Sequence, residues 1–312
     1  MLMEGIHHVT AITGDAPRNL DFYTRVVGLR LVAKTVNQDD PNVYHLFYGE
    51  EQGRPGADLT FFEYRNAIPG RAGAGSVHRI VWRVASPEAL GFWAARLTAE
   101  GIEIDRDETS IRFSDFEGLG LELVVSSVAD SPRVAEHPEI PAEFAIQGFD
   151  GVRVYSGNPL GTTAILERVM GAKQLDDRTW DVRGEQRGGW IALDEPPAQP
   201  GRQSAGTVHH VAWGIGDDDE QAWLDALANA GVPNSGLIDR NYFHSIYFRE
   251  PGGVLFELAT EGPGFTVDGP VEELGKKTIL PPWLEPQRDR IVANLVPLED
   301  PRANWPDPVR NS

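Results

Sequence analysis

The chain has 312 residues, of which 41% are hydrophobic, and this is enough to build two packed domains. Its formal net charge of −19 argues against binding to nucleic acid or to an anionic membrane surface, and the absence of cysteine excludes disulfides and thiolate metal sites. No apolar run approaches the roughly 18 residues of a membrane span, and Met1–Gly5 lacks the features of a signal peptide. We therefore expect a cytoplasmic protein without a membrane segment.

One pattern repeats four times along the chain. Each copy begins with a strand-like run of one apolar residue, two variable residues and a second apolar residue. These runs start at Ile6, Val77, Phe149 and Val208. A helix-like segment follows each run and ends in a glycine, which readily adopts the left-handed conformation beyond a helix C-terminus. The four glycines are Gly28, Gly101, Gly171 and Gly231. Shorter alternating runs follow, so the repeat predicts four β-α-β-β-β units.

Two segments lie outside these units. The segment 126–148 contains three prolines and several polar residues, which is typical of a linker. The sequence therefore predicts an N-terminal domain at 1–125 and a C-terminal domain at 149–265, each with two units. Residues 266–312 are rich in proline, and we expect them to form an arm that packs over the body of the protein.

Histidine pairs occupy equivalent places in the first and fourth units. His7 and His8 lie in the run IHHVTAIT, and His209 and His210 lie in TVHHVAWGI. A single acid, Glu257, interrupts the apolar run VLFELA near the end of the fourth unit. Buried carboxylates are rare unless they are paired or bind a metal. Two imidazoles and one carboxylate are the ligands of an open-sided Fe(II) site.

Alignment of the four units indicates which of them could hold a metal. The second variable position of the first strand reads His8, Arg79, Gly151 and His210. The acid position of the last strand reads Glu63, Glu122, Ala192 and Glu257. Only the first and fourth units have a possible ligand at both positions. The pattern predicts one metal held by these two units and a structural role for the other two. His78 is expected to be structural, and His45 and His137 to lie on loops or polar faces.

The sequence resembles the vicinal oxygen chelate superfamily, which includes glyoxalase I, extradiol dioxygenases and bleomycin-resistance proteins. Within it, the chain is most similar to ring-cleaving dioxygenases that act on hydroquinones. The runs that carry the resemblance are HHVTAITGDAPRNLDFYTRVVGLRLVAKTVNQDDPNVYHLFYG, TVHHVAWG and SIYFREPGGVLFELATEGPGF, and it covers nearly all of residues 4–290. It implies an α+β fold in which four βαβββ units form two open, curled sheets.

The resemblance also implies roles for individual residues. It assigns the metal to His8, His210 and Glu257, and it places His7 and His209 beside the substrate pocket as proton carriers. Tyr247 matches a pocket tyrosine that hydrogen-bonds or protonates the oxygenated intermediate, and Arg240 matches a nearby substrate-binding arginine. Two further substrate-binding candidates come from their positions in the chain. They are Thr10, which shares a face with His8 on a strand, and His244, which precedes the strand of Tyr247.

The expected activity is cleavage of a small aromatic diol, such as a hydroquinone, by an enzyme that uses Fe(II) and O2. Mn(II) accepts the same ligands, so the two metals are not distinguished. The oligomeric state also stays open. Four units in one chain can form both sheets without a partner, although a homo-oligomer is compatible with them.

Two other functions are compatible with the motifs. A glyoxalase-I-like isomerase or lyase would need a fourth protein ligand, for which Glu63 is the candidate, and would favour Zn or Ni. A ligand-sequestering protein of the bleomycin-resistance kind would have neither a metal nor an activity.

Overall fold

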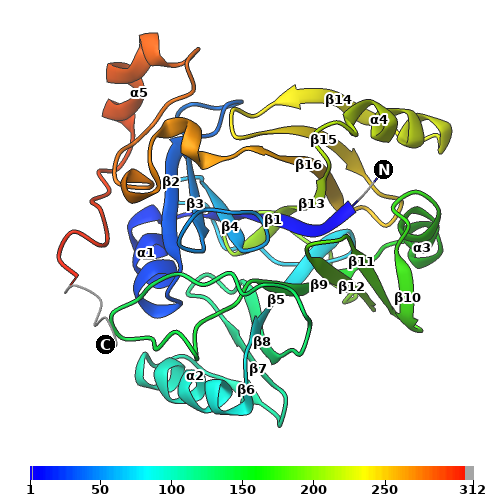
Figure 1. The fold of residues 1–312 in the computed structure, drawn as a ribbon, viewed down its shortest axis with the longest axis horizontal. Helices are drawn as coiled ribbons and strands as arrows, with labels where there is room; N and C mark the ends of the chain where they lie inside the picture. The colour runs from blue at the N-terminus through cyan, green and yellow to red at the C-terminus, as the bar shows by residue number, and fades with distance from the viewer. Residues whose placement is uncertain (2, 306–312) are drawn as a thin grey trace.

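Sixteen strands form two open, mixed sheets of eight strands each in this computed structural model, which describes residues 1 and 3–305 (Figure 1). The first unit comprises β1 (Met3–Thr13), α1 (Ala16–Asp21), the π-helical turn η1 (Phe22–Val26), β2 (Arg30–Val36), β3 (Tyr44–Gly49) and β4 (Asp58–Glu63). The second comprises β5 (Ser76–Val84), α2 (Pro87–Ala99), β6 (Asp105–Arg106), β7 (Ser110–Ser114) and β8 (Gly120–Val125).

The C-terminal half repeats the same order of elements. The third unit comprises β9 (Phe149–Tyr155), α3 (Pro159–Arg168), β10 (Lys173–Asp176), β11 (Thr179–Arg183) and β12 (Gly188–Asp194). The fourth comprises β13 (Thr207–Ile215), α4 (Glu220–Asn229), β14 (Asn234–Asp239), β15 (Phe243–Arg249) and β16 (Leu255–Pro263). The predicted α+β fold of four βαβββ units in two open sheets is confirmed.

The two sheets combine units from opposite halves of the chain. The first sheet has the order β14-β15-β16-β13-β1-β4-β3-β2, so it joins the fourth unit to the first. The second has the order β10-β11-β12-β9-β5-β8-β7-β6 and joins the third unit to the second. Each sheet therefore takes one unit from each predicted domain, 1–125 and 149–265. The antiparallel pair of β1 and β13 brings the two histidine pairs together at the centre of the first sheet.

Apolar side chains form two separate clusters. The main core includes the fully buried Trp82, Trp93 and Trp213. A smaller cluster belongs to the first sheet and its flanking segments, and it includes Phe47 and Phe243. The second cluster adjoins the first histidine pair, since the ring centroid of Phe243 is 5.0 Å from those of His7 and His8. The site described below is therefore set in apolar packing.

The segment after the fourth unit follows the edge strand β2. The arm includes the short 3-10 turns η2 (Phe265–Asp268), η3 (Val271–Glu273) and η4 (Glu285–Gln287), and the helix α5 (Arg288–Asn294) (Figure 1). Ile279 N donates to the Lys34 carbonyl over 2.9 Å, and Lys34 Nζ donates to the Leu298 carbonyl over 2.6 Å. The arm thus covers the backbone of an otherwise open sheet edge. Residues 306–312 of the predicted arm lie outside the described residues.

Residues 126–148 connect β8 to β9 without a strand or helix of their own in the part of the chain that the structure describes. Several of their side chains are nevertheless buried, among them Ile140 and Ile146. Trp93 Nε1 in α2 donates to the Phe144 carbonyl over 2.7 Å. The segment is therefore anchored against the second unit along part of its length.

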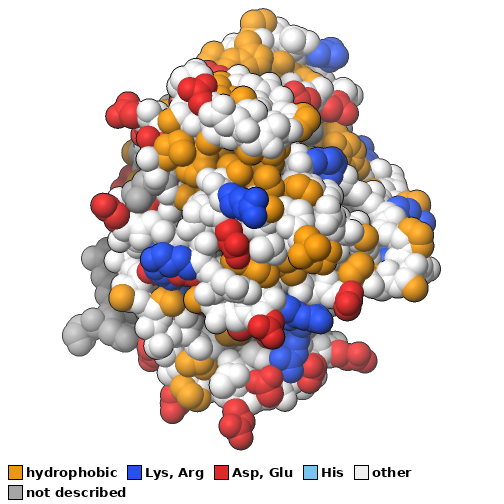
Figure 2. All heavy atoms as spheres, turned by 90° about the vertical axis from the view of Figure 1, so that its right-hand side faces the viewer, with side chains coloured by type: hydrophobic (Ala, Val, Ile, Leu, Met, Phe, Trp, Pro, Cys, Tyr) orange, Lys and Arg blue, Asp and Glu red, His pale blue; other side chains and the backbone are white. Residues whose placement is uncertain are grey.

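The outer surface reflects the acidic composition. Figure 2 shows the face that carries α3 and α4, where Asp and Glu side chains lie mostly around the outline and hydrophobic side chains lie nearer the middle. Across the residues that the structure describes, every helix is too short or too polar to cross a bilayer.

A buried carboxylate joins the two sheets. Glu4 in β1 accepts hydrogen bonds from three backbone amides in the turn between β11 and β12, those of Glu185 (3.1 Å), Gln186 (3.0 Å) and Arg187 (3.3 Å). Glu4→Ala leaves these donors without their acceptor, so we expect the free energy of unfolding to fall by about 2–4 kcal/mol. A urea titration measures the change. Glu185→Ala removes an exposed carboxylate from the same turn and is the control. Equal effects of the two substitutions would contradict the assignment.

Candidate metal centre

His8, His210 and Glu257 meet at the centre of the first sheet. β1 and β13 run antiparallel with Thr10 opposite His210, and β16 runs parallel to β13 with Glu257 opposite Ala212. The two Nε2 atoms of His8 and His210 are 3.3 Å apart. Glu257 Oε2 lies 3.2 Å from His8 Nε2 and 2.8 Å from His210 Nε2. All three side chains are buried, so three candidate ligand atoms lie close together away from solvent.

The hydrogen bonding of Glu257 fits a metal ligand. Its Oε1 atom accepts from Ser245 Oγ over 2.5 Å. Its Oε2 atom is buried, and its nearest polar neighbours are His210 Nε2 at 2.8 Å and His8 Nε2 at 3.2 Å. A buried carboxylate is costly unless it is neutralised, and a metal cation between these three atoms would neutralise it. The residues present therefore fit a divalent ion held by two imidazole nitrogens and one carboxylate oxygen.

A chain of hydrogen bonds sets the proton positions on His7 and His8. His7 Nε2 lies 3.1 Å from the Thr260 carbonyl, which can only accept, so Nε2 carries the proton. Burial lowers the pKa of His7 well below its usual value, so the ring is neutral and its Nδ1 is an acceptor. His8 Nδ1, 2.9 Å away, must therefore donate to it. This leaves His8 Nε2 unprotonated and directed at the other two ligand atoms.

The second histidine pair repeats this geometry. In each pair the ring centroids are 5.1 Å apart and the ring planes are at 79°. His209 Nδ1 lies 2.8 Å from His210 Nδ1. When His210 Nε2 acts as a ligand, its Nδ1 carries the proton and donates to His209. Burial lowers the pKa of His209 to about 3, so this ring is neutral and its own proton lies on Nε2.

A cavity of about 300 Å³ opens beside the three ligands. Its lining includes His8, His45, Phe62, His209, Arg240 and Tyr247. Tyr247 lies opposite Glu257 in the pairing of β15 with β16. Burial raises the pKa of Tyr247 above its usual value, so the hydroxyl is protonated at neutral pH and can donate. The predicted pocket residues His209, Arg240 and Tyr247 are thus brought together around one cavity.

Arg240 lies at the rim of this cavity. Its Nε donates to Tyr247 Oη over 3.3 Å, and its Nη2 donates to Asp39 Oδ2 over 3.0 Å. Gln38 Nε2 donates to the Arg240 carbonyl over 2.9 Å. Gln38 and Asp39 both lie in the loop between β2 and β3. The rim therefore joins a loop of the first unit to a turn of the fourth.

Three predicted pocket residues do not line the cavity. His7 lies behind His8, because the β1–β13 register shifts between Ile6 and His8 and the neighbouring rings turn toward each other. Thr10 is fully buried, and its Oγ lies 2.8 Å from Thr60 Oγ. The side chain of His244 is 43% exposed and its Nδ1 lies 2.5 Å from Glu220 Oε1 at the start of α4. Thr10 and His244 therefore lie outside this cavity, and their contact with a substrate stays a prediction.

Glu63 does not reach the ligands, so its alignment with Glu257 was wrong. In the fourth unit, Glu257 pairs with Ala212, which lies two residues after His210. In the first unit, the residue two positions after His8 is Thr10, and it pairs with Thr60. Thr60 is therefore the true equivalent of Glu257. Glu63 lies three residues further along β4, where its Oε1 accepts from Ala16 N over 3.0 Å at the start of α1. The alignment had matched the acids, whereas the strand register decides which positions are equivalent.

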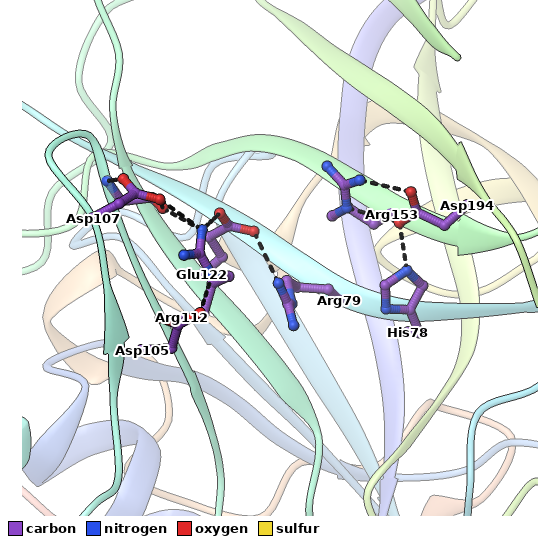
Figure 3. A network of polar contacts seen from close by, with 9 residues as sticks. His78, Arg79, Asp105, Asp107, Arg112, Glu122, Arg153 and Asp194 are labelled. Carbon is purple, nitrogen blue, oxygen red and sulfur yellow. Dashed lines mark hydrogen bonds and ion pairs between the residues drawn. The ribbon is translucent and has the colours of Figure 1, made fainter. Parts of the chain in front are cut away.

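The second sheet carries ion pairs at the equivalent place (Figure 3). Arg79 corresponds to His8 and Glu122 to Glu257, and their charged groups are 3.5 Å apart. Arg112 approaches the other oxygen of Glu122, also at 3.5 Å. His78 Nε2 lies 2.8 Å from Asp194 Oδ2. Here a guanidinium group neutralises the carboxylate that a metal would neutralise in the first sheet.

Sequence reasoning missed three residues near the ligands. His45 lies in the cavity wall rather than on a polar face, Thr60 replaces the expected acid, and Ser245 supports Glu257. His45 and Phe47 alternate along β3 in the same way as Ser245 and Tyr247 along β15. This alternation was the available signal, but it becomes visible only after the strands have been paired.

Comparison with known proteins agrees with this architecture. A family model described as "Glyoxalase/Bleomycin resistance protein/Dioxygenase superfamily" matches residues 5–124 and 148–258. A Bacillus subtilis protein named "Putative ring-cleaving dioxygenase MhqA" is 39% identical over an alignment of 318 positions. The alignment covers 96% of this chain and 100% of that protein. The "Chlorohydroquinone/hydroquinone 1,2-dioxygenase" of Sphingobium indicum is 30% identical over an alignment of 321 positions. The alignment covers 94% of this chain and 96% of that protein.

Solved structures show the same likeness. A structure described as a "putative dioxygenase from Bacillus subtilis" superposes with a TM-score of 0.88 at 37% identity, covering 96% of this chain and 98% of that one. Glyoxalase I from Zea mays superposes with a TM-score of 0.58 at 15% identity, covering 82% of this chain and 92% of that one. The second likeness concerns the fold alone.

Proposed function

The chain belongs to the glyoxalase/bleomycin resistance protein/dioxygenase superfamily, and from this premise we propose that it is a ring-cleaving, Fe(II)-dependent dioxygenase of hydroquinones or related aromatic diols. The names of relatives that match almost the whole chain support ring cleavage, and one of them is a hydroquinone dioxygenase. The observation that carries the proposal is the buried group of two imidazoles and one carboxylate beside an aromatic-lined cavity. Mn(II) accepts the same ligands.

His8, His210 and Glu257 would hold the ion through two nitrogens and one oxygen. A ferrous ion with only three protein ligands supplies open positions for a phenolate and for dioxygen. Phe62 and Phe243 would flank the aromatic ring and exclude water from it. Because apolar walls also weaken dielectric screening, the polar groups of the cavity act on a bound oxygen more strongly than they would in water.

Three polar side chains of the cavity can act as hydrogen-bond donors. Tyr247 and His209 line the cavity, and each has a proton that it can donate, on Oη in Tyr247 and on Nε2 in His209 when His210 binds the ion. Tyr247 is suited to protonate an oxygen of the substrate during the reaction, and His209 to carry a proton to or from it. Arg240 stays charged and would hold a substrate oxygen at the rim. A site rich in donors favours a substrate that offers phenolate or phenol oxygens.

The glyoxalase-like alternative loses its main support. That chemistry would need a fourth protein ligand, and the equivalent position is Thr60, whose hydroxyl is bonded to Thr10 and His45. A ligand-sequestering protein without a metal would have no use for the buried group of two imidazoles and one carboxylate. The dioxygenase therefore fits the described residues better than either alternative.

Oxygen consumption tests the proposal. The protein is loaded with Fe(II) under argon, its iron content is measured, and hydroquinone, chlorohydroquinone or catechol is added in air-saturated buffer. We expect the consumption of about one O2 per diol, with a ring-opened product in the mass spectrum. A sample loaded with Zn(II), which has no redox chemistry, is the control and should consume none. Full iron occupancy without oxygen uptake on any diol would exclude the proposed reaction.

A further inference from the structure

His45 forms part of the cavity wall on β3, on the side of the first unit. Its ring lies between two phenyl rings, with centroid distances of 3.9 Å to Phe47 and 4.4 Å to Phe62. Burial lowers its pKa well below the usual value of histidine, so the ring is neutral at neutral pH. The neutral ring has one nitrogen that donates and one that accepts. The role of His45 therefore depends on which nitrogen carries the proton.

Two buried hydroxyl groups determine the position of that proton. His45 Nε2 lies 2.9 Å from Thr60 Oγ, which in turn lies 2.8 Å from Thr10 Oγ. If Nε2 carried the proton, one of the two buried hydroxyl protons would lack an acceptor among these three groups, and this is costly. If Thr10 donates to Thr60 and Thr60 donates to Nε2, every proton has an acceptor. The proton of His45 then lies on Nδ1, and no contact described for the protein uses that atom.

The strand register shows what this wall replaces. In the fourth unit, Tyr247 pairs with Glu257, and Ser245 donates to the same carboxylate. In the first unit, Phe47 pairs with Thr60. His45, two residues before Phe47, is therefore the equivalent of Ser245, and Thr60 is the equivalent of Glu257. Where a symmetric site would have a second ligand carboxylate, this protein has a short hydroxyl side chain and an imidazole.

We propose that His45 is a substrate-binding residue whose Nδ1–H donates a hydrogen bond to an oxygen of the aromatic substrate. This inference rests on the proposed function, because it takes a phenol or phenolate oxygen as the acceptor. The small Thr60 leaves room on this side of the three ligands, and the Thr10–Thr60 pair keeps the proton on the nitrogen that is not bonded to Thr60. The flanking rings of Phe47 and Phe62 restrict rotation of the imidazole.

Two substitutions of His45 separate its two nitrogens. In His45→Asn the amide nitrogen can lie near the place of Nδ1 and keep a donor there. In His45→Gln the longer side chain reaches the place of Nε2 and can bond Thr60, but it offers no donor near Nδ1. The dissociation constant of hydroquinone is measured for each iron-loaded protein under argon by calorimetry. We expect a rise of about tenfold or more for His45→Gln and of no more than about threefold for His45→Asn.

A third substitution leaves His45 in place. Thr60→Val removes the hydroxyl that holds the proton on Nδ1, so the ring can adopt either tautomer and we expect hydroquinone to bind about threefold more weakly or worse. Iron content and near-ultraviolet circular dichroism show whether each variant keeps its metal and its packing. Equal losses in His45→Asn and His45→Gln, or no loss in either, would overturn the proposal. So would unchanged binding in a folded, iron-loaded Thr60→Val protein.

These measurements are independent of oxygen chemistry, because they are made under argon. If the wild-type protein consumed no oxygen but His45→Gln still bound hydroquinone about tenfold more weakly than His45→Asn, the proposed reaction would be wrong and the role of His45 would stand. If oxygen were consumed but the two variants bound hydroquinone equally well, the reaction would stand and His45 would be part of the wall only.

Discussion

Glu257→Gln is expected to abolish oxygen consumption and to lower the affinity for Fe(II) by more than about 100-fold. Loss of a residue that merely supports a ligand costs about 10- to 100-fold in metal affinity, so loss of the only anionic ligand should cost at least as much. The amide keeps the size of the side chain, and Ser245 Oγ can still donate to its oxygen. Metal analysis after dialysis against a defined Fe(II) concentration measures the affinity.

The same substitution has a second expected effect that does not involve activity. In the absence of metal, Glu257 is a buried charge beside two imidazoles, whereas the introduced glutamine is neutral and its amide can donate to an unprotonated imidazole nitrogen. We therefore expect the metal-free protein to be more stable by about 1 kcal/mol, as seen in a urea titration. A strongly destabilised variant would show that Glu257 holds the fold together rather than a metal.

Glu122→Gln is the matched control. Glu122 occupies the same place in the second sheet, where Arg79 and Arg112 lie beside it. Its substitution should leave iron content and oxygen consumption close to those of the unmodified protein. Equal iron loss in the two variants would mean that the first sheet does not hold the metal alone.

Arg240→Ala is expected to reduce the specificity constant for hydroquinone by about 5- to 100-fold more than that for catechol. A catechol can place both oxygens at the metal, whereas the second oxygen of a hydroquinone lies across the ring and needs a polar partner at a distance. Arg240 is placed for this role, because it lies at the rim and already donates to Tyr247 Oη. Steady-state oxygen consumption with both diols measures the ratio.

The control for this prediction is Arg249→Ala. Arg249 is an exposed residue on the same strand as Tyr247, and it donates to the Gly253 carbonyl over 2.9 Å. Its substitution removes the same charge from outside the cavity that Arg240 and Tyr247 line, on the side where Arg249 borders a separate cavity with His209 and His210. If Arg240→Ala lowered the constants for both diols by the same factor, or lowered neither, Arg240 would be only a partner of Asp39 at the rim.

The sequence alone determined the repeat and therefore the fold. The pattern of apolar residues, the terminal glycines and the spacing of the short runs are local features, and each reports the periodicity of one helix or strand. The duplicated histidine pair was equally visible, because two rare residues recur at the same place in two units. This recurrence predicted a metal between the first and fourth units, and the resemblance to the superfamily selected His8, His210 and Glu257. The structure brings their candidate ligand atoms within 4.8 Å of one another.

Only the tertiary structure decided the positions that depend on strand register. A slip along a strand leaves its composition unchanged but gives each residue a different partner, so the sequence could not separate Glu63 from Thr60 as the equivalent of Glu257. The same reason explains why Thr10 was expected in the cavity and why His45 was missed. The inward turn of His7 toward His8 follows from an irregularity in the β1–β13 pairing, which involves residues about 200 positions apart and leaves no local signal.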